Sequence, residues 1–257
     1  MQDRLNNYLR DLTQLLLSTL QETVSAISVG GSIVYRDFQS CASDVDVAVF
    51  LSDHPSAAQL SALARQLDHC VLPCPAKGLD LVAFHTQSVE STPPTPAAAF
   101  AFVTGENWRT ELTGPEKSPD LLVDLFVLRN HGRTAYGPHP RDLIGSIDER
   151  ALCPLLAGII QWHRAKIHDS FHDPTGEFAV LNTCRAWRYF ITGIMGSKSA
   201  GGDWALARRQ DLTVIDAALA RRRSKQTGRL NKSEVLQCIS AIEIEIDRAG
   251  CESRGQS

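Results

Sequence analysis

Residues 44–51, DVDVAVFL, constrain the fold more than any other segment of the sequence. Successive side chains of a strand point to opposite faces of a sheet, so alternating residues share a face. One face of this segment is wholly apolar and consists of Val45, Val47, Val49 and Leu51. The other face begins with Asp44 and Asp46. The segment therefore predicts a buried strand with two neighbouring carboxylates at its start.

The remaining hydrophobic patterns change character along the chain. Leucines at helical spacing predict an amphipathic helix at the N-terminus, and further strands are expected at 23–29 and 79–84. Helices are expected at 56–67 and 119–132. From about residue 147 helical periodicity dominates, with pieces near 147–168, 177–193, 198–209, 211–223 and 231–249. We expect an α/β domain up to about residue 145, followed by a helical domain.

Length and composition exclude several classes of protein. A chain of 257 residues with 43% hydrophobic residues can bury a sizeable core, and its longest apolar runs fall short of the ~20 residues that cross a bilayer. A net charge of −3 argues against nucleic acid as a partner. Seven scattered cysteines and a polar N-terminus predict a reduced, cytoplasmic protein. The hydrophobic pattern of the sequence shows no exposed apolar stripe that would need a partner subunit, so we expect a monomer.

The carboxylates of Asp44 and Asp46 form the first candidate site. Two like charges close together on a partly buried surface are unfavourable unless a cation neutralises them or one of them binds a proton. Mg²⁺ suits this position, because it binds a few carboxylates and keeps places for phosphate oxygens and water. Taken by itself, an Asp-x-Asp pair is more often a solvated strand end with two surface aspartates.

Two further features favour the metal interpretation. Gly31 and Ser32 end the preceding strand, and a glycine turn that opens a helix exposes backbone N–H groups that attract an anion. In LDLVAF, Asp80 repeats the pattern of a carboxylate at the start of a buried strand. Three carboxylates beside an anion-binding turn predict a metal-dependent site for phosphoryl or nucleotidyl transfer.

At this point the sequence resembles a known family. VGGSIVYRDFQSCASDVDVAVFL is similar to the GS…SD-x-D signature of the polymerase-β-like nucleotidyltransferases. TGENWRTEL, PDLLVDLFVLRNHGRTAYGP and VLNTCRAWRYFITGIMGSKSAGGDWAL resemble successive blocks of the aminoglycoside 3″/9-adenylyltransferases, the streptomycin and spectinomycin resistance enzymes. The resemblance spans roughly residues 25–220. It implies a nucleotidyltransferase domain with a mixed sheet (1–145) and an all-α helical-bundle domain (146–257), with ATP and the drug in the cleft between them.

The resemblance also implies roles for individual residues. Transfer of AMP to a drug hydroxyl, with release of pyrophosphate, would use Mg²⁺ on Asp44 and Asp46 and a catalytic base at Asp80. The residues implied in nucleotide binding are Gly31, Ser32, Ser43, Arg185 and Lys198. The residues implied in binding the aminoglycoside are Trp108, Asp173 and Glu177.

The sequence departs from the family pattern in three places. Asp80 stands where the family carries a glutamate, so the proposed base is one methylene shorter. Arg36 stands where the motif usually has a second glycine. An aromatic residue that contacts the nucleotide late in the helical domain has no counterpart here, where the chain reads Arg221-Arg222-Arg223-Ser224.

These departures leave two alternatives open. One is a nucleotidyltransferase that acts on a different small molecule or on a protein side chain. The other is a degenerate nucleotide-binding protein without catalysis.

Several polar residues are expected away from the core. The run Arg221-Arg222-Arg223 is typical of a solvated helix end, and His163 is expected on the surface. The glycine- and serine-rich segment around Lys198, GSKSAGG, is typical of a mobile loop.

Overall fold

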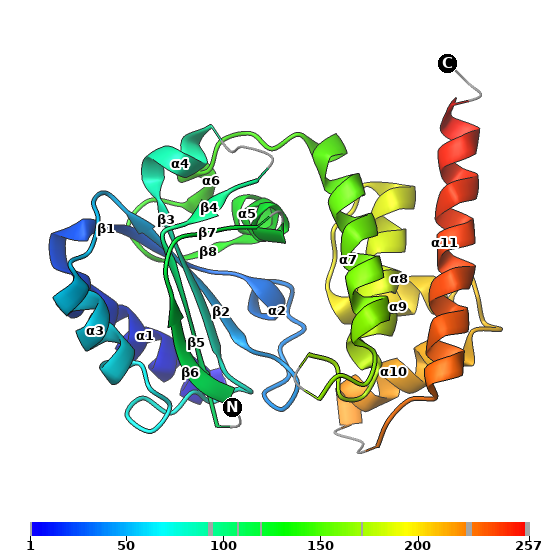
Figure 1. Cartoon of the computed structure of the whole chain (residues 1–257), viewed down its shortest axis with the longest axis horizontal. Helices are drawn as coiled ribbons and strands as arrows, with labels where there is room; N and C mark the ends of the chain where they lie inside the picture. Colours follow the sequence, from blue (N-terminus) through cyan, green and yellow to red (C-terminus); the bar gives the residue numbers. More distant parts are fainter. Residues whose placement is uncertain are drawn as a thin grey trace. The chain divides into compact units, whose positions relative to one another are not determined.

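The computed structural model describes residues 2–91, 95–106, 108–118, 120–170, 172–224 and 228–254, with the backbone alone at 108, 109, 224 and 250–254. The chain divides into two compact units, Met1–Asp148 and Glu149–Ser257. The first is a mixed α/β unit and the second is helical, as the sequence predicts (Figure 1). Among the described residues, no helix is long and apolar enough to cross a membrane.

A six-stranded sheet forms the centre of the N-terminal unit, in the spatial order β6-β5-β3-β2-β1-β8. Its strands are β1 (Val24–Val29), β2 (Val45–Leu51), β3 (Leu79–His85), β5 (Phe100–Gly105), β6 (Trp108–Thr113) and β8 (Arg133–Tyr136). The short strands β4 (Ala97–Ala98) and β7 (Glu116–Lys117) pair separately. Strands β2 and β3 are parallel, whereas β1–β2, β3–β5, β5–β6 and β1–β8 are antiparallel. The mixed sheet agrees with the predicted fold class.

Helices lie on both faces of this sheet (Figure 1). They are α1 (Gln2–Leu20), α2 (Gly31–Val34), α3 (Ala57–Gln66), α4 (Thr86–Glu90), α5 (Asp120–His131) and α6 (Pro140–Leu143), with a 3₁₀ turn η1 (Gln21–Thr23). The leucines that predict the first helix are all buried. Helix α3 begins with a capping box, in which the Ser56 hydroxyl accepts a hydrogen bond from the Gln59 N–H.

The two faces of β2 enter two different cores. Val45, Val47 and Val49 pack in a cluster with the buried leucines of α1 and α3. Ala48 and Phe50, on the opposite face, pack with Leu125 and Leu128 of α5. Asp46 shares its face with Ala48 and Phe50, so it lies on the side of the sheet that α5 covers.

The C-terminal unit consists of helices. They are α7 (Leu152–Lys166), α8 (Glu177–Thr192), α9 (Lys198–Leu206), α10 (Thr213–Ser224) and α11 (Lys232–Arg254), preceded by a 3₁₀ turn η2 (Glu149–Ala151). Helix α8 contacts each of the other four α-helices, and more than half of its own residues are buried. It is therefore the central element of this unit.

The segment GSKSAGG is not a mobile loop but the start of α9. The Ser197 hydroxyl caps the helix by accepting a hydrogen bond from the Ala200 N–H at 3.1 Å. Gly201 and Gly202 are buried. A Cβ atom at Gly201 would lie 2.7 Å from the Arg185 Cα atom of α8, and one at Gly202 would lie 2.8 Å from a Leu219 methyl carbon of α10. Gly201 therefore lets the backbones of α8 and α9 approach closely, and Gly202 leaves room for the Leu219 side chain of α10.

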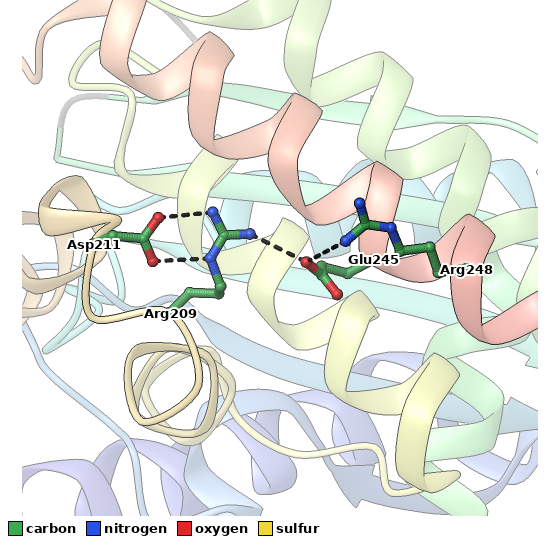
Figure 2. A network of polar contacts seen from close by, with 4 residues as sticks. All are labelled: Arg209, Asp211, Glu245 and Arg248. Carbon is green, nitrogen blue, oxygen red and sulfur yellow. Dashed lines mark hydrogen bonds and ion pairs between the residues drawn. The ribbon is translucent and has the colours of Figure 1, made fainter.

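An ion-pair network joins the loop after α9 to α11 (Figure 2). The Arg209 guanidinium donates to Asp211, with a 2.7 Å contact to Oδ2, and also lies 3.3 Å from Glu245 Oε1. Arg248, one turn further along α11, reaches the same Glu245 oxygen at 3.5 Å. Asp211 and Arg248 are exposed, so solvent screens these pairs and each contributes little to stability.

Two surface expectations for this unit are wrong. Arg222 is buried, with its guanidinium 3.7 Å from Glu177, because α10 packs that side of the arginine run against α8. His163 is buried too, and its Nε2 lies 2.8 Å from the Asn182 amide nitrogen.

Replacing Gly201 by alanine tests the close approach of α8 and α9. Alanine favours an isolated helix by about 1 kcal/mol, but here the added methyl group meets backbone atoms of Arg185, so we expect a loss of about 1–3 kcal/mol in unfolding free energy. Gly158→Ala in α7 is the matched control, because a Cβ atom there has open space and should stabilise the protein. Urea unfolding measures both, and equal gains for the two variants would contradict this packing.

Candidate active site

The pairing of β2 with β3 brings two of the predicted acidic residues together. In the parallel register, Asp46 lies opposite Asp80 and both are the second residue of their strands. Their side chains therefore emerge on the same face, at the end of the sheet where both strands begin. The sequence predicts this neighbourhood, and the structure confirms the register that creates it.

Asp80 lies in an acidic and desolvated environment. Its pKa is raised to about 7, mainly by burial and in addition by the negative charges of Asp124 and Asp44. Asp124 projects from α5 and was not among the residues predicted for the site. A single acidic residue within the apolar stretch LLVDLFVL was the signal for it, because such a residue must face either solvent or a polar site.

The turn after β1 faces Asp46 directly. Gly31 has a positive φ of 56°, and a Cβ atom at this position would lie 1.7 Å from Asp46 Oδ2. Only glycine fits here, for both backbone and steric reasons. The Gly30 N–H donates to the Asp46 carbonyl oxygen at 2.9 Å, which fixes the turn to β2. The predicted phosphate-binding turn and a predicted metal ligand are therefore in contact.

Ser32 offers a hydrogen-bonding group without a protein partner. Its Oγ atom is buried and forms no hydrogen bond with any described residue. A buried polar atom without a partner is uncommon and points to a missing ligand or water. The Ser32 hydroxyl could donate a hydrogen bond to a phosphate oxygen, which is the role predicted for this residue.

Ser43 has a structural role that the sequence did not predict. Its buried hydroxyl accepts a hydrogen bond from the Gln39 N–H at 3.0 Å, and its carbonyl oxygen accepts one from the Lys77 N–H at 2.9 Å. The next ladder bond runs from the Val45 N–H to the Gly78 carbonyl oxygen at 2.8 Å. These bonds hold Asp44 against the segment that leads into β3 and Asp80.

The carboxylates fit a magnesium ion that a nucleotide completes. Within the described part of the chain, no three His, Cys, Asp or Glu side chains are arranged as a metal site by themselves. Mg²⁺ commonly binds through one or two carboxylates together with substrate phosphates, so a pair such as Asp44 and Asp46 suffices. The negative charges close to Asp80 mean that a cation bound here would lower the repulsion between these carboxylates.

The C-terminal unit holds the two predicted basic residues on neighbouring helices. Arg185 lies on α8 where α9 packs closest, and its buried Nε atom has no hydrogen-bond partner among the described residues. Lys198 is the first residue of α9, and its ammonium group lies 4.3 Å from the centre of the Phe178 ring. Both positions are held by the helix packing described above.

The residues predicted to bind the drug fall into different environments. Asp173 is buried, and its carboxylate accepts hydrogen bonds from the N–H groups of Gly176, Phe178 and Ala179, so it caps the start of α8. Glu177 pairs with Arg222, but burial raises its pKa and its Oε1 atom accepts no hydrogen bond from a described residue. The Trp108 side chain lies outside the described residues. Substrate binding by these three residues stays a prediction.

Comparison with known proteins identifies the C-terminal region. Residues 143–243 match the family described as aminoglycoside adenylyltransferase, C-terminal domain. No curated protein sequence matches the chain significantly.

Comparison with solved structures identifies the fold of the whole chain. The crystal structure of the spectinomycin adenyltransferase AAD(9) from Enterococcus faecialis, determined with ATP and spectinomycin, is similar with a TM-score of 0.78 at 15% sequence identity. The likeness covers 94% of this chain and 99% of that one. The structural likeness confirms the predicted fold class. The sequence match agrees with the predicted family over residues 143–243, the region of the adenylyltransferase C-terminal domain.

The raised pKa of Asp80 predicts a pH-dependent stability of the metal-free protein. The stabilising contribution of this carboxyl group is complete below about pH 4, the pKa of an unfolded aspartate, and is lost as pH rises through about 7. Asp80→Asn should therefore equal the wild type at pH 4 and become more stable than it towards pH 8, by at most about 4 kcal/mol before solvent screening.

Asp68→Asn is a control of opposite sign. The Thr110 hydroxyl and the Cys70 N–H donate to Asp68 and lower the pKa of its carboxyl group. This substitution should destabilise the protein at neutral pH, and the effect should fade as pH falls. Urea unfolding between about pH 2 and pH 8 measures both trends, because the effect of Asp68 fades only below about pH 4. A pH-independent effect of Asp80→Asn would contradict the mutual repulsion of the acidic residues around Asp80.

Proposed function

We propose that this protein transfers AMP from ATP to a hydroxyl group of spectinomycin, streptomycin or both, and releases pyrophosphate. The match of residues 143–243 to the aminoglycoside adenylyltransferase family supports this reaction. Support for ATP and spectinomycin comes from the similar enzyme, whose structure was determined with both molecules. Streptomycin as an acceptor rests on the family resemblance of the sequence alone.

One observation carries the proposal. The backbone of Gly31, at the start of α2, lies against the Asp46 carboxylate with no room for a side chain between them. A phosphate bound at this turn would therefore lie next to a carboxylate, which is a repulsive arrangement without a cation. Asp44 and Asp46 would hold Mg²⁺, whose contribution when bound is to offset the charge on phosphate oxygens.

The same geometry suggests how the protein's own residues promote the transfer. The acceptor hydroxyl attacks the α-phosphorus of ATP, a phosphorus–oxygen bond forms, and the bond to pyrophosphate breaks. Asp80 would accept the hydroxyl proton, and its place opposite Asp46 puts it beside the proposed Mg²⁺ ligands, where the acceptor hydroxyl would be aligned for attack. The Ser32 hydroxyl and the turn at Gly31 would orient the phosphates. On the family resemblance alone, Arg185 and Lys198 of the C-terminal unit would neutralise the charge of pyrophosphate as it leaves.

The acceptor is cationic, so acidic residues would bind it. Of the two predicted carboxylates, Glu177 supports this role better, because Asp173 already accepts three backbone hydrogen bonds. Trp108, at the start of β6, would pack against a sugar ring. We keep these assignments as part of the proposal.

A drug panel tests the reaction against its two alternatives. The protein is incubated with ATP, Mg²⁺ and single aminoglycosides, and pyrophosphate and product mass are measured. Drug-dependent pyrophosphate with an AMP adduct is the expected result. Turnover only with another acceptor would support the first alternative, and nucleotide binding without any turnover would support the degenerate protein.

Asp46→Asn should reduce transfer by at least a hundredfold while the fold remains intact. The amide keeps the shape of the side chain but loses the negative charge that binds a cation, and removal of such a preorganised charge costs roughly 10²–10³ in kcat. Initial rates at several Mg²⁺ concentrations measure the effect. An active variant with unchanged Mg²⁺ dependence would overturn the metal assignment.

Asp80→Ala should separate chemistry from nucleotide binding. Loss of a general base typically lowers kcat by about 10²–10⁴, whereas the affinity for ATP should change little. Steady-state kinetics and equilibrium binding of a non-hydrolysable ATP analogue measure the two quantities. If kcat and ATP affinity fell by the same factor, Asp80 would be a binding residue and not the base.

A further inference from the structure

A basic cleft lies beside the turn that holds Gly31, within the N-terminal unit. It has a volume of about 970 Å³, and its walls come from α1, α2 and the junction between α5 and β8. Four of its lining residues are basic or titratable to a cation, Arg36, His131, Arg133 and His139. None of the described residues that line the cleft is acidic. The proposed reaction uses none of these four side chains.

The backbone at Arg36 is strained. Arg36 has a positive φ of 56°, a conformation that side chains other than those of glycine, asparagine and aspartate seldom adopt. Strained residues persist where the surrounding structure holds them, and they cluster at functional sites. Arg36 is therefore the strained residue of the cleft lining, and it is also the residue that stands where the family motif usually has glycine.

The basic groups are available to a ligand. Arg36 and Arg133 are exposed, and their guanidinium groups form no ion pair with any described residue. The His139 Nδ1 atom accepts a hydrogen bond from the Arg141 N–H at 3.2 Å, which leaves its Nε2 atom as the N–H donor of the ring. The His131 ring is held against the Tyr35 ring, with centroids 4.9 Å apart.

We propose that this cleft binds a small organic phosphate monoester, with Arg36 and Arg133 on the phosphate and the apolar wall on the organic group. Guanidinium forks match phosphate oxygens in pairs, and a monoester carries about 1.5–2 negative charges near pH 7, which suits two permanent cations better than a single carboxylate does. Ile33, Val34 and Phe38 supply the apolar wall. The volume is typical of a site for a small molecule.

Titration calorimetry with phenyl phosphate tests the proposal. The full chain is first saturated with Mg²⁺ and a non-hydrolysable ATP analogue, so that the phosphate turn at Gly31 is occupied. Phenyl phosphate should then bind, whereas benzoate, with the same ring and one charge, should bind at least tenfold more weakly. This readout does not depend on adenylyl transfer, so the proposed function and the proposed cleft can fail separately.

Three variants locate the binding. Arg36→Gly and Arg133→Ala should each weaken phenyl phosphate binding by roughly tenfold or more, since each removes charge-assisted hydrogen bonds. Arg36→Gly should unfold at the same or a higher temperature, because glycine adopts the positive φ without strain. Arg65→Ala, an exposed arginine of α3 outside the cleft, is the control and should bind as the wild type does. No binding by the wild type, equal binding of benzoate, or equal binding by all variants would overturn the proposal.

Discussion

The parallel pairing of β2 with β3 is the constraint on which the site depends. It places Asp46 opposite Asp80 and puts both carboxylates on the face of the sheet that α5 covers with Asp124. A shift of one residue in either strand would turn its carboxylate into the other core, among the leucines of α1 and α3. The register is secured because both faces of β2 are buried. Burial of the two strands therefore holds the acidic residues at their start in place. It also makes the ionised form of Asp80 less favourable.

The acidic residues and the glycine turn depend on one another physically. Negative charge around Asp80 opposes ionisation of that residue, and the turn at Gly31 brings phosphate-binding groups to the same carboxylates. A nucleotide alone would add to the repulsion, and a cation alone would lack phosphate oxygens to complete its coordination. This mutual dependence is why the arrangement favours nucleotidyl transfer over simple anion binding.

Much of this could be predicted from sequence because the informative segments are strongly periodic. The strand at 44–51, the leucine-rich first helix and the helices of the C-terminal unit follow from hydrophobic spacing alone. Strand β8 has no such signal, since most of its residues are exposed at a sheet edge. The burial of Arg222 and the close packing of Gly201 could not be predicted, because each depends on which helix a distant segment meets.

Gly31 at the start of α2 and Arg36 just after its end both have a positive φ, and the conformational strain of the two residues differs. Gly31 adopts a φ of 56° without penalty, and its missing side chain is required by the Asp46 carboxylate. Arg36 adopts the same φ at a cost of roughly 1–2 kcal/mol, although glycine would fit the backbone better. The first departure from ordinary backbone geometry is explained by the close Asp46 carboxylate. The second is not, and a side chain that works in the neighbouring cleft is the explanation that accounts for both the strain and the basic lining.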